Sequence, residues 1–169
     1  MAKGEEIRHQ IEHIIRQEEA LTFTRFDENT AFELGSLIRN IALEEKLGVA
    51  IDISLWDRRL FFAATAGTSA DNHEWIRRKF NVVRRFHAAT YRLVLQHNRD
   101  DSMFAPHRGL NVEDYALAGG GFPIRVAGIG AIGAVVVSGL PQREDHNLVV
   151  RGLAVFLGLD LAGLALPSA

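Results

Sequence analysis

The fold class is decided by residues 49–64, VAIDISLWDRRLFFAA. Two apolar runs, 49–55 and 60–64, flank the polar link 56–59. Apolar runs of this length, rich in β-branched and aromatic residues and joined by a short polar segment, are typical of a β-hairpin. We therefore predict two antiparallel strands here and a sheet built from hairpins.

A second hairpin is predicted towards the C-terminal end of the chain. Residues 119–126, GGGFPIRV, and residues 129–138 are apolar runs separated by Gly128 and Gly130. Because the residue before a proline disfavours the helical conformation, Phe122-Pro123 predicts an extended entry to the first of these strands. Shorter strands, or a turn in the second case, are predicted at residues 21–26 and 112–117.

Helical periodicity fills the segments between these strands. Apolar residues recur every three or four positions in four segments, which are residues 5–19, 31–48, 71–96 and the segment from Pro141 to Leu157. The predicted order is therefore α-β-α-β-β-α-β-β-α. This order predicts an α/β protein of the α+β type, with a mainly antiparallel sheet flanked by helices.

Composition favours one globular domain spanning residues 1–169. The chain is 47% hydrophobic and 24% charged, which suffices for a core without an excess of charge. It contains no cysteine, so disulfides, thiolate metal sites and cysteine nucleophiles are excluded. The lack of cysteine and of an apolar leader in the first residues predicts a cytoplasmic protein.

Charge and hydropathy limit the classes of partner. A formal net charge of -2 gives no general attraction to nucleic acid. The longest uncharged stretch, residues 126–140, is shorter than the roughly 20 residues that a membrane-spanning helix needs. We expect neither a nucleic acid nor a membrane partner.

The segment 71–96, predicted as one long helix, carries two neighbouring apolar stripes. They consist of Ile76, Phe80, Val83, Tyr91 and Val94, and of Trp75, Val82, Phe86 and Leu93. Two apolar stripes exceed what one contact with a sheet needs, so we predict a homo-oligomer. On this reading His87, beside the first stripe, is a core or interface residue.

The same segment is locally basic. Six cations, Arg77, Arg78, Lys79, Arg84, Arg85 and Arg92, stand against Asp71 and Glu74. Arginine side chains bind carboxylates and phosphates, so this face predicts a small anionic ligand or an acidic protein partner. Salt bridges within the chain are the structural alternative.

Two polar residues at the start of this helix have different predicted roles. Asp71 precedes Glu74 at the spacing of a capping box, so Asp71 is predicted to cap the helix. Asn72 is left to contact a ligand or a partner strand.

Two later motifs are further candidates for a binding site. Gly120 and Gly121 would let a ligand approach the backbone, or would serve close packing of the chain itself. Asp145-His146 opens the last helix, where it either caps the helix or orients an imidazole. No second ligand at metal spacing accompanies it, so no metal site is predicted.

Three blocks of the sequence resemble the UPF0303 family, which belongs to the haem-degrading, GlcG-like (HbpS-like) superfamily. They are GTSADNHEWIRRK at residues 67–79, GGGFPI at residues 119–124, and the closing block at 132–142 with Asp145 and His146. Where the family has His before the glycines this chain has Ala118. Where the family has Gly-His-Ser-Ser-Tyr, this chain has His-Ala-Ala-Thr-Tyr at residues 87–91.

The resemblance implies a profilin-like fold, homo-oligomers built from dimers and a distant link to haem-binding proteins. Our first hypothesis is a protein that binds haem or another small anionic ligand, and whether it is an enzyme is left open. The second is a non-enzymatic oligomeric scaffold that binds a protein through the basic helix face. The candidate ligand-binding residues are Asn72, Trp75, Arg78, Lys79, Gly120, Gly121, Phe122, Pro123, Asp145 and His146.

For haem, the candidate axial ligands are His107, in a predicted loop, and His146, at a predicted helix start. Both positions are predicted to reach a planar ligand without opening the core.

Overall fold

The computed structural model describes residues 3–166, and five strands within them form one sheet. The strands lie in the order β1-β4-β5-β2-β3. Only the β1–β4 pair is parallel, so the predicted mainly antiparallel sheet is confirmed. The strands are β1 (Thr22–Phe23), β2 (Ala50–Leu55), β3 (Arg59–Ala64), β4 (Gly121–Val126) and β5 (Gly130–Ser138).

The two predicted hairpins, β2–β3 and β4–β5, form the body of the sheet. They join at a seam between β2 and β5, where Ile53 lies opposite Val135 and Ala50 lies opposite Ser138. The strand predicted at residues 21–26 is present as the short β1. Residues 112–117 form no strand and instead belong to a loop that begins with a turn.

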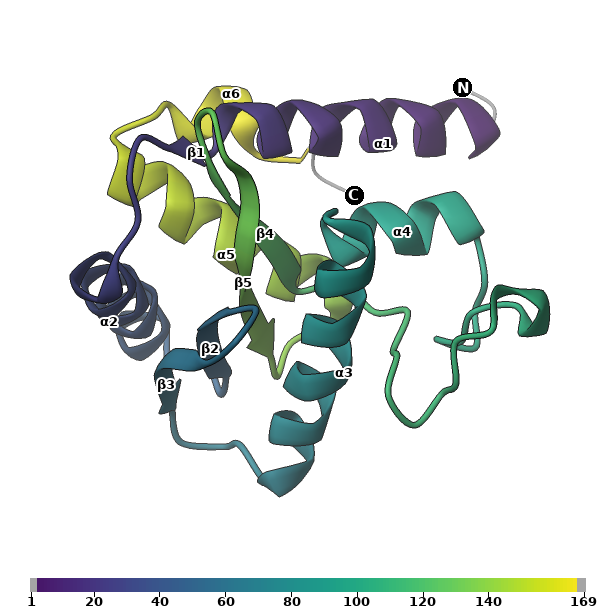
Figure 1. Cartoon of the computed structure of the whole chain (residues 1–169), viewed down its shortest axis with the longest axis horizontal. Coiled ribbons are helices and arrows are strands. Elements are labelled where there is room, and N and C mark those ends of the chain that lie inside the picture. Colours follow the sequence, from purple (N-terminus) through teal and green to yellow (C-terminus); the bar gives the residue numbers. More distant parts are fainter. Residues whose placement is uncertain (1–2, 167–169) are drawn as a thin grey trace.

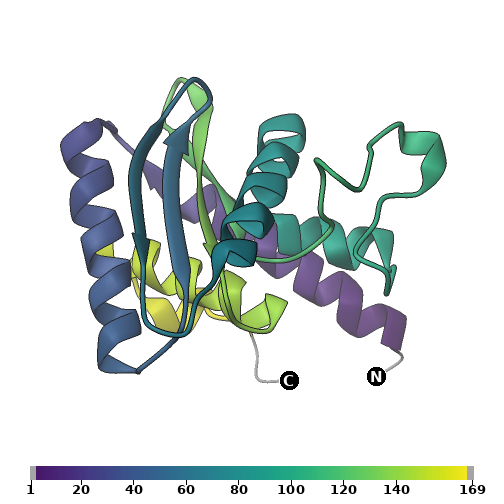
Figure 2. The ribbon, with the colours of Figure 1, turned by 90° about the horizontal axis from the view of Figure 1, so that it is seen from below.

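Helices cover both faces of this sheet. Figure 2 shows the strands between α2 on one side and α3 on the other. The N-terminal helix α1 packs beside α4 at one end of the molecule (Figure 1). The helices are α1 (Lys3–Ala20), α2 (Glu28–Glu44), α3 (Ala70–Phe86), α4 (Thr90–His97), α5 (Gln142–Leu157) and α6 (Leu161–Leu164), with a short 3-10 turn η1 (Pro106–Arg108).

Side-chain alternation along the strands divides the core into two parts. On one face, Ile51, Ile53 and Val135 are fully buried with side chains of α2 and α5. On the other, Ala50 and Val136 pack against Ile76 and Val83 of α3. The sheet is therefore buried on both faces, and α3 alone closes the second one over the β2–β5 seam.

The single long helix predicted at residues 71–96 is wrong, because the chain breaks between Phe86 and Thr90. His87 adopts the left-handed conformation, with φ +51°, and ends α3. The backbone N–H of Ala89, which precedes α4, donates to the buried carboxylate of Glu18 at 2.6 Å. A side chain from α1 therefore occupies the N-terminus of α4 and fixes the new helix direction.

The break between α3 and α4 also changes which surfaces the two apolar stripes contact. Val82 of α3 and Leu93 of α4 are both buried in the same core as the sheet. The stripes are thus covered within the chain and do not by themselves require a second subunit. His87 is exposed and stacks on Trp56 with ring centroids 5.3 Å apart, so the core alternative is wrong, and the interface alternative stays a prediction.

Within residues 3–166, none of the helices combines the length and the apolar character needed to cross a lipid bilayer.

Candidate functional site

Lys79 of α3 is an ammonium group inside the protein, with 3% of its surface exposed. Its Nζ donates to the carbonyl of Val137 in β5 and to Oδ2 of Asp145 in α5, both at 3.0 Å. The other oxygen of Asp145 accepts from the backbone N–H of Leu140 at 2.9 Å. One buried ion pair thus joins α3, β5 and the start of α5.

Burial drives both partners towards their neutral forms. Desolvation lowers the pKa of Lys79 and raises the pKa of Asp145, while the attraction between the two charges opposes each shift. The proton affinities of the two groups are therefore closer together than those of an exposed lysine and aspartate.

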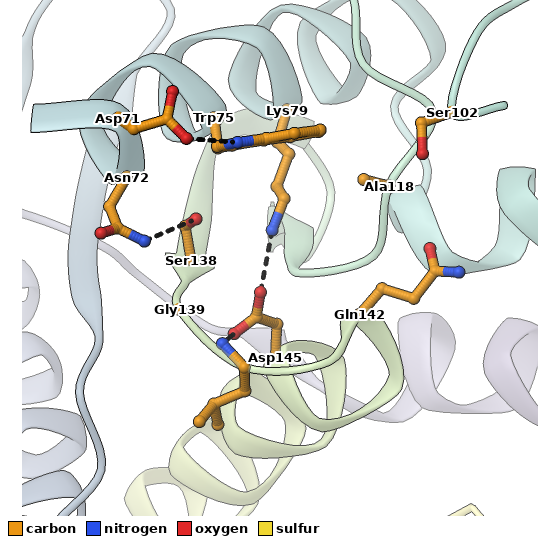
Figure 3. Close-up of a pocket in the computed structure, with 11 residues that line it drawn as sticks. Asp71, Asn72, Trp75, Lys79, Ser102, Ala118, Ser138, Gly139, Gln142 and Asp145 are labelled. Carbon is orange, nitrogen blue, oxygen red and sulfur yellow. Dashed lines mark hydrogen bonds and ion pairs between the residues drawn. The ribbon is translucent and has the colours of Figure 1, made fainter. Parts of the chain in front are cut away.

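This ion pair lies at the bottom of a pocket of about 340 Å³, which we call the Lys79 pocket. In Figure 3 Lys79 extends from α3 towards Asp145, with the indole of Trp75 above its side chain. The lining residues come from the start of α3, the loop after α4, the end of β5 and the start of α5. They are Asp71, Asn72, Trp75, Lys79, Ser102, Ala118, Ser138, Gly139, Leu140, Gln142 and Asp145.

Side-chain amides and a hydroxyl add polar groups around the ammonium. Asn72 accepts from the N–H of Ser69 through Oδ1 at 2.9 Å, which leaves its Nδ2 at 3.5 Å from Oγ of Ser138. Gln142 accepts from the N–H of Gly119 through Oε1 at 3.2 Å. Each amide is held by its oxygen, so its NH₂ group remains as a donor for the pocket.

Gly120 allows the lysine to reach the strand. A Cβ on Gly120 would lie 2.4 Å from the carbonyl oxygen of Val137 and 2.8 Å from Nζ of Lys79. Its φ of +122° also lies in a region that other residues rarely adopt. Of the two roles open for this glycine, close packing of the chain is the one that the geometry favours.

The structure brings four of the predicted binding residues together at the pocket surface. They are Asn72, Trp75, Lys79 and Asp145, and Gly120 lies directly behind the ion pair. Arg78 lies outside the lining, with its guanidinium 4.1 Å from the centre of the Trp75 ring. Gly121, Phe122 and Pro123 are buried in β4, where they build the core.

His146 is buried in the core, which corrects its prediction as an accessible haem ligand and as a surface cap. Its side chain is fully buried, and Nε2 lies 2.8 Å from Oε1 of Gln17 in α1. Burial lowers its pKa to about 3. The opening turn of α5 points this imidazole inwards, on the side away from solvent.

The structure also tests the predictions made for His107, Asp71 and Asn72. His107 is exposed on η1 and does not line the Lys79 pocket. Asp71 does not cap α3, because Ser69 is the N-cap residue, and its carboxylate accepts from Nε1 of Trp75 at 3.1 Å. The bond from Ser69 to Asn72 also shows that Asn72 has a structural task that its sequence position concealed.

Part of the basic face is engaged within the chain. Arg77 donates to Glu74 at 3.0 Å and to Asp114 at 2.9 Å, and Arg92 lies 3.3 Å from Glu18. Lys79, counted with this face from the sequence, points into the protein. The six cations therefore do not form one solvated surface.

Sequence reasoning missed several residues of the pocket. Ser138 and Gln142 lie inside the closing block that resembles UPF0303 proteins, so that block could have identified them. Ser102 carries no such signal, because the fold of the loop after α4 brings it to the pocket, and the sequence marks Ala118 only as the position where the family has His. The N–H of Leu117 donates to the carbonyl of Ser102 at 2.9 Å and closes this loop.

Comparison with known proteins identifies the family. The family model described as haem degrading protein HbpS-like matches residues 26–154. A UPF0303 protein of Brucella anthropi is 70% identical over 168 residues, which cover 99% of both chains. A UPF0303 protein of Brucella melitensis is 69% identical over the whole of both chains. The chain belongs to the UPF0303 family of HbpS-like proteins.

Solved structures agree with this assignment. The UPF0303 chain resembles Ybr137w with a TM-score of 0.81 and 28% identity, over 93% of this chain and 95% of that one. It resembles HbpS with a TM-score of 0.63 and 18% identity, over 80% and 92% of the two chains. The structure titled PduOC:Heme Complex gives a TM-score of 0.63 at 15% identity, over 79% and 94%. These last two similarities concern the fold alone.

Proposed function

We propose that this UPF0303 protein binds a small organic anion in the Lys79 pocket. One observation carries the proposal: two sequence blocks that are distant in the chain, residues 67–79 and 138–145, meet at one hollow with a buried ammonium at its floor. Pockets that combine a concave shape, a few converging polar groups and perturbed pKa values are the usual form of small-molecule sites.

The donors of the pocket favour an anion. An ammonium group has three N–H donors, and Lys79 uses two of them on Val137 and Asp145, which leaves one for a ligand. The NH₂ groups of Asn72 and Gln142 add neutral donors. A carboxylate accepts from several donors at once and so matches this set, while the carboxylates of Asp71 and Asp145, which accept from Trp75 and Lys79, oppose its negative charge.

The volume of the pocket and the indole of Trp75 limit the size and the polarity of the part of the ligand that is not the carboxylate. A volume of about 340 Å³ lies at the lower end of the range for small-molecule sites. The indole of Trp75 supplies one flat apolar surface, fixed through its N–H by Asp71. We therefore expect a short carboxylic acid with a small apolar part.

Haem does not fit this pocket. Haem iron is held by His, Cys, Met or Tyr side chains, and none of these lines the Lys79 pocket. The haem named for PduOC belongs to a protein 15% identical to this one, so it gives no support for haem at these residues. Our proposal therefore concerns a small anion, and the predicted role of His107 as a haem ligand stays a prediction.

The alternative of a scaffold with a basic docking face has less support. Arg77 and Arg92 are paired with acidic residues of the chain itself, and Lys79 is buried. Assembly into homo-oligomers, built from dimers, stays a prediction that light scattering at micromolar concentration tests.

A binding experiment with one fluorescent reporter tests the proposal. The chain has two tryptophans, so the variant Trp56→Phe leaves Trp75 as the single indole reporter. We expect acetate, pyruvate or a related short carboxylate to change its emission in a saturable way. Asn72→Ala and Gln142→Ala should each weaken that response, and Gln96→Ala, an exposed amide on α4, should not.

Native mass spectrometry of freshly purified protein gives an independent measurement. A retained small acid would support the proposal and reveal its identity. An unchanged Trp75 signal with every short carboxylate, together with a mass equal to that of the bare chain, would overturn it.

A further inference from the structure

A second hollow lies on the same face of the sheet as α3, at the turn of the β2–β3 hairpin. It has a volume of about 250 Å³ and shares no lining residue with the Lys79 pocket. We call it the Arg59 hollow. Its lining residues are Asp52, Ser54, Leu55, Trp56, Asp57, Arg58, Arg59, His73, Ile76, Arg77 and Phe80.

Asp52 is a carboxylate inside the sheet, with 2% of its surface exposed. Ala50 and Val136, which are close to it on this face of the sheet, are apolar. Oδ1 accepts from Oγ of Ser54 at 2.6 Å, and Oδ2 accepts from Nε of Arg59 at 2.5 Å. A buried charge is costly unless it is paired, so Asp52 holds Arg59 firmly in one place.

Two contacts within the chain hold the Arg59 side chain, and the outer edge of its guanidinium group faces solvent. Besides the bond from Nε to Asp52, its guanidinium carbon lies 4.7 Å from the centre of the Phe62 ring. Nearly half of the side chain, 45%, is exposed. The Nη1 and Nη2 groups have no hydrogen-bond partner within residues 3–166, so they can donate two parallel hydrogen bonds to a carboxylate.

The neighbouring cations of the hollow are already engaged. Arg58 donates to Asp57 at 3.0 Å and to Glu28 at 2.6 Å. Arg77 is paired with Glu74 and Asp114. Arg59 is therefore the arginine of this hollow whose outer edge is open to a ligand.

Flat side chains form the rest of the hollow. Trp56 packs against Phe80 with ring centroids 5.8 Å apart, and its Nε1 is held by the carbonyl of Ala131 at 3.1 Å. His73 stands edge-on to Phe62 at 5.7 Å. His87 already stacks on Trp56, with ring centroids 5.3 Å apart, so a ligand ring would pack against the surfaces of these rings that His87 leaves uncovered.

We propose that the Arg59 hollow binds a planar aromatic carboxylate, whose carboxylate pairs with the Nη groups of Arg59 and whose ring packs among Trp56, His73 and Phe80. Asp52 is a positioning residue in this site, since it contacts Arg59 and not the ligand. The volume of about 250 Å³ lies below the usual range for small-molecule sites, which limits the ligand to a small ring such as that of benzoate.

The test uses Trp56 as the reporter. In the variant Trp75→Phe it is the single tryptophan, and benzoate is the probe. We expect a saturable change in Trp56 emission. Cyclohexanecarboxylate, which keeps the charge but has no planar ring, should bind about two- to ten-fold more weakly. Benzyl alcohol, which keeps the ring but has no charge, should bind at least about ten-fold more weakly.

Variants identify the residue that binds the carboxylate. Arg59→Gln should weaken benzoate binding by about ten-fold or more, whereas Arg84→Gln, at an exposed arginine of α3 outside the hollow, should have little effect. Because Arg59→Gln leaves Asp52 buried without its partner, His73→Ala provides a second test at an exposed wall residue, and it should also weaken binding. Benzoate binding that is indifferent to Arg59→Gln and to His73→Ala would overturn the proposal, as would the lack of any saturable response.

The two sites are separated by repeating the titration in the variant Trp56→Phe. Benzoate should leave Trp75 emission unchanged there. A benzoate response from Trp75 that Asn72→Ala removes, together with no response of Trp56 in the variant Trp75→Phe, would place the ligand in the Lys79 pocket and overturn the Arg59 site. Failure of short carboxylates to affect Trp75 concerns only the function proposed for the Lys79 pocket.

Discussion

Gln17 in α1 and His146 in α5 meet through their side chains inside the core. Because Nε2 of Gln17 donates to the carbonyl of Leu164 at 2.6 Å, its Oε1 is the acceptor for Nε2–H of His146 at 2.8 Å. This bond fixes the neutral tautomer of the imidazole. Nδ1 has no hydrogen-bond partner within the described part of the chain, so a proton added there would be a buried, unpaired charge.

The first prediction is that His146 makes the protein less stable in acid. Burial lowers its pKa from 6.5 to about 3 in the folded state, so between these values the unfolded chain binds the extra proton. The free energy of unfolding should therefore fall as pH falls through this window, by up to about 1.4 kcal/mol per pH unit from this group. Urea unfolding between pH 7 and pH 4 measures it. In His146→Phe this dependence should be weaker, and an equal slope in both proteins would contradict the prediction.

The second prediction concerns the ion pair of the Lys79 pocket. Lys79→Met leaves Asp145 buried without its partner, so it should lower the free energy of unfolding by about 3–5 kcal/mol. The double variant Lys79→Met with Asp145→Leu should recover much of this loss, since no charge remains buried. A double-mutant cycle with denaturant unfolding gives both values. If the two single losses simply add, the buried pair is not the reason for them.

The third prediction compares two glycines. Gly120→Ala places a Cβ against the carbonyl oxygen of Val137 and Nζ of Lys79, in a backbone conformation that already disfavours alanine. Gly130→Ala also strains the backbone, with φ +106°, but no atom lies within 4 Å of its Cβ. Gly120→Ala should lower the thermal midpoint more than Gly130→Ala. Equal shifts would mean that backbone strain, and not crowding at the ion pair, sets the cost.

The fourth prediction concerns the start of α4. Glu18 is 4% exposed and accepts from the N–H of Ala89, so Glu18→Ala leaves a buried donor without a partner. We expect a loss of about 1–3 kcal/mol in the free energy of unfolding. Glu18→Gln keeps an acceptor at this position and should lose less. Glu19→Ala, at an exposed neighbouring position, is the control, and a loss as large as that of Glu18→Ala would count against the capping role.

Local sequence patterns were sufficient for the sheet. Both hairpins could be predicted because an apolar run, a polar or glycine-rich turn and a second apolar run are close together in the chain. The break at His87 could not, because residues 88–94 stay apolar at helical spacing while the partner of Ala89 is Glu18, in a distant helix. The sequence around Ala89 does not show which distant side chain accepts a hydrogen bond from its backbone N–H.

The candidate site was predictable in part, and the reason there was a family resemblance. Asn72, Trp75, Lys79 and Asp145 lie in blocks that resemble a known family, which drew attention to them before their positions were known. The direction of each side chain was not predictable. Lys79 has the same charge as the arginines beside it on α3, and only the sheet beneath it and Asp145 decide that it points inwards.

The seam between β2 and β5 has a consequence for how this chain acquires its structure. Each hairpin needs only short loop closure, a process of microseconds, whereas the seam must join strands that lie on opposite sides of α3 and α4 in the chain. We therefore expect the seam to form late and to set the folding rate. Until it closes, β2 and β5 each present an unpaired edge, so newly made chains are most prone to aggregate at this stage.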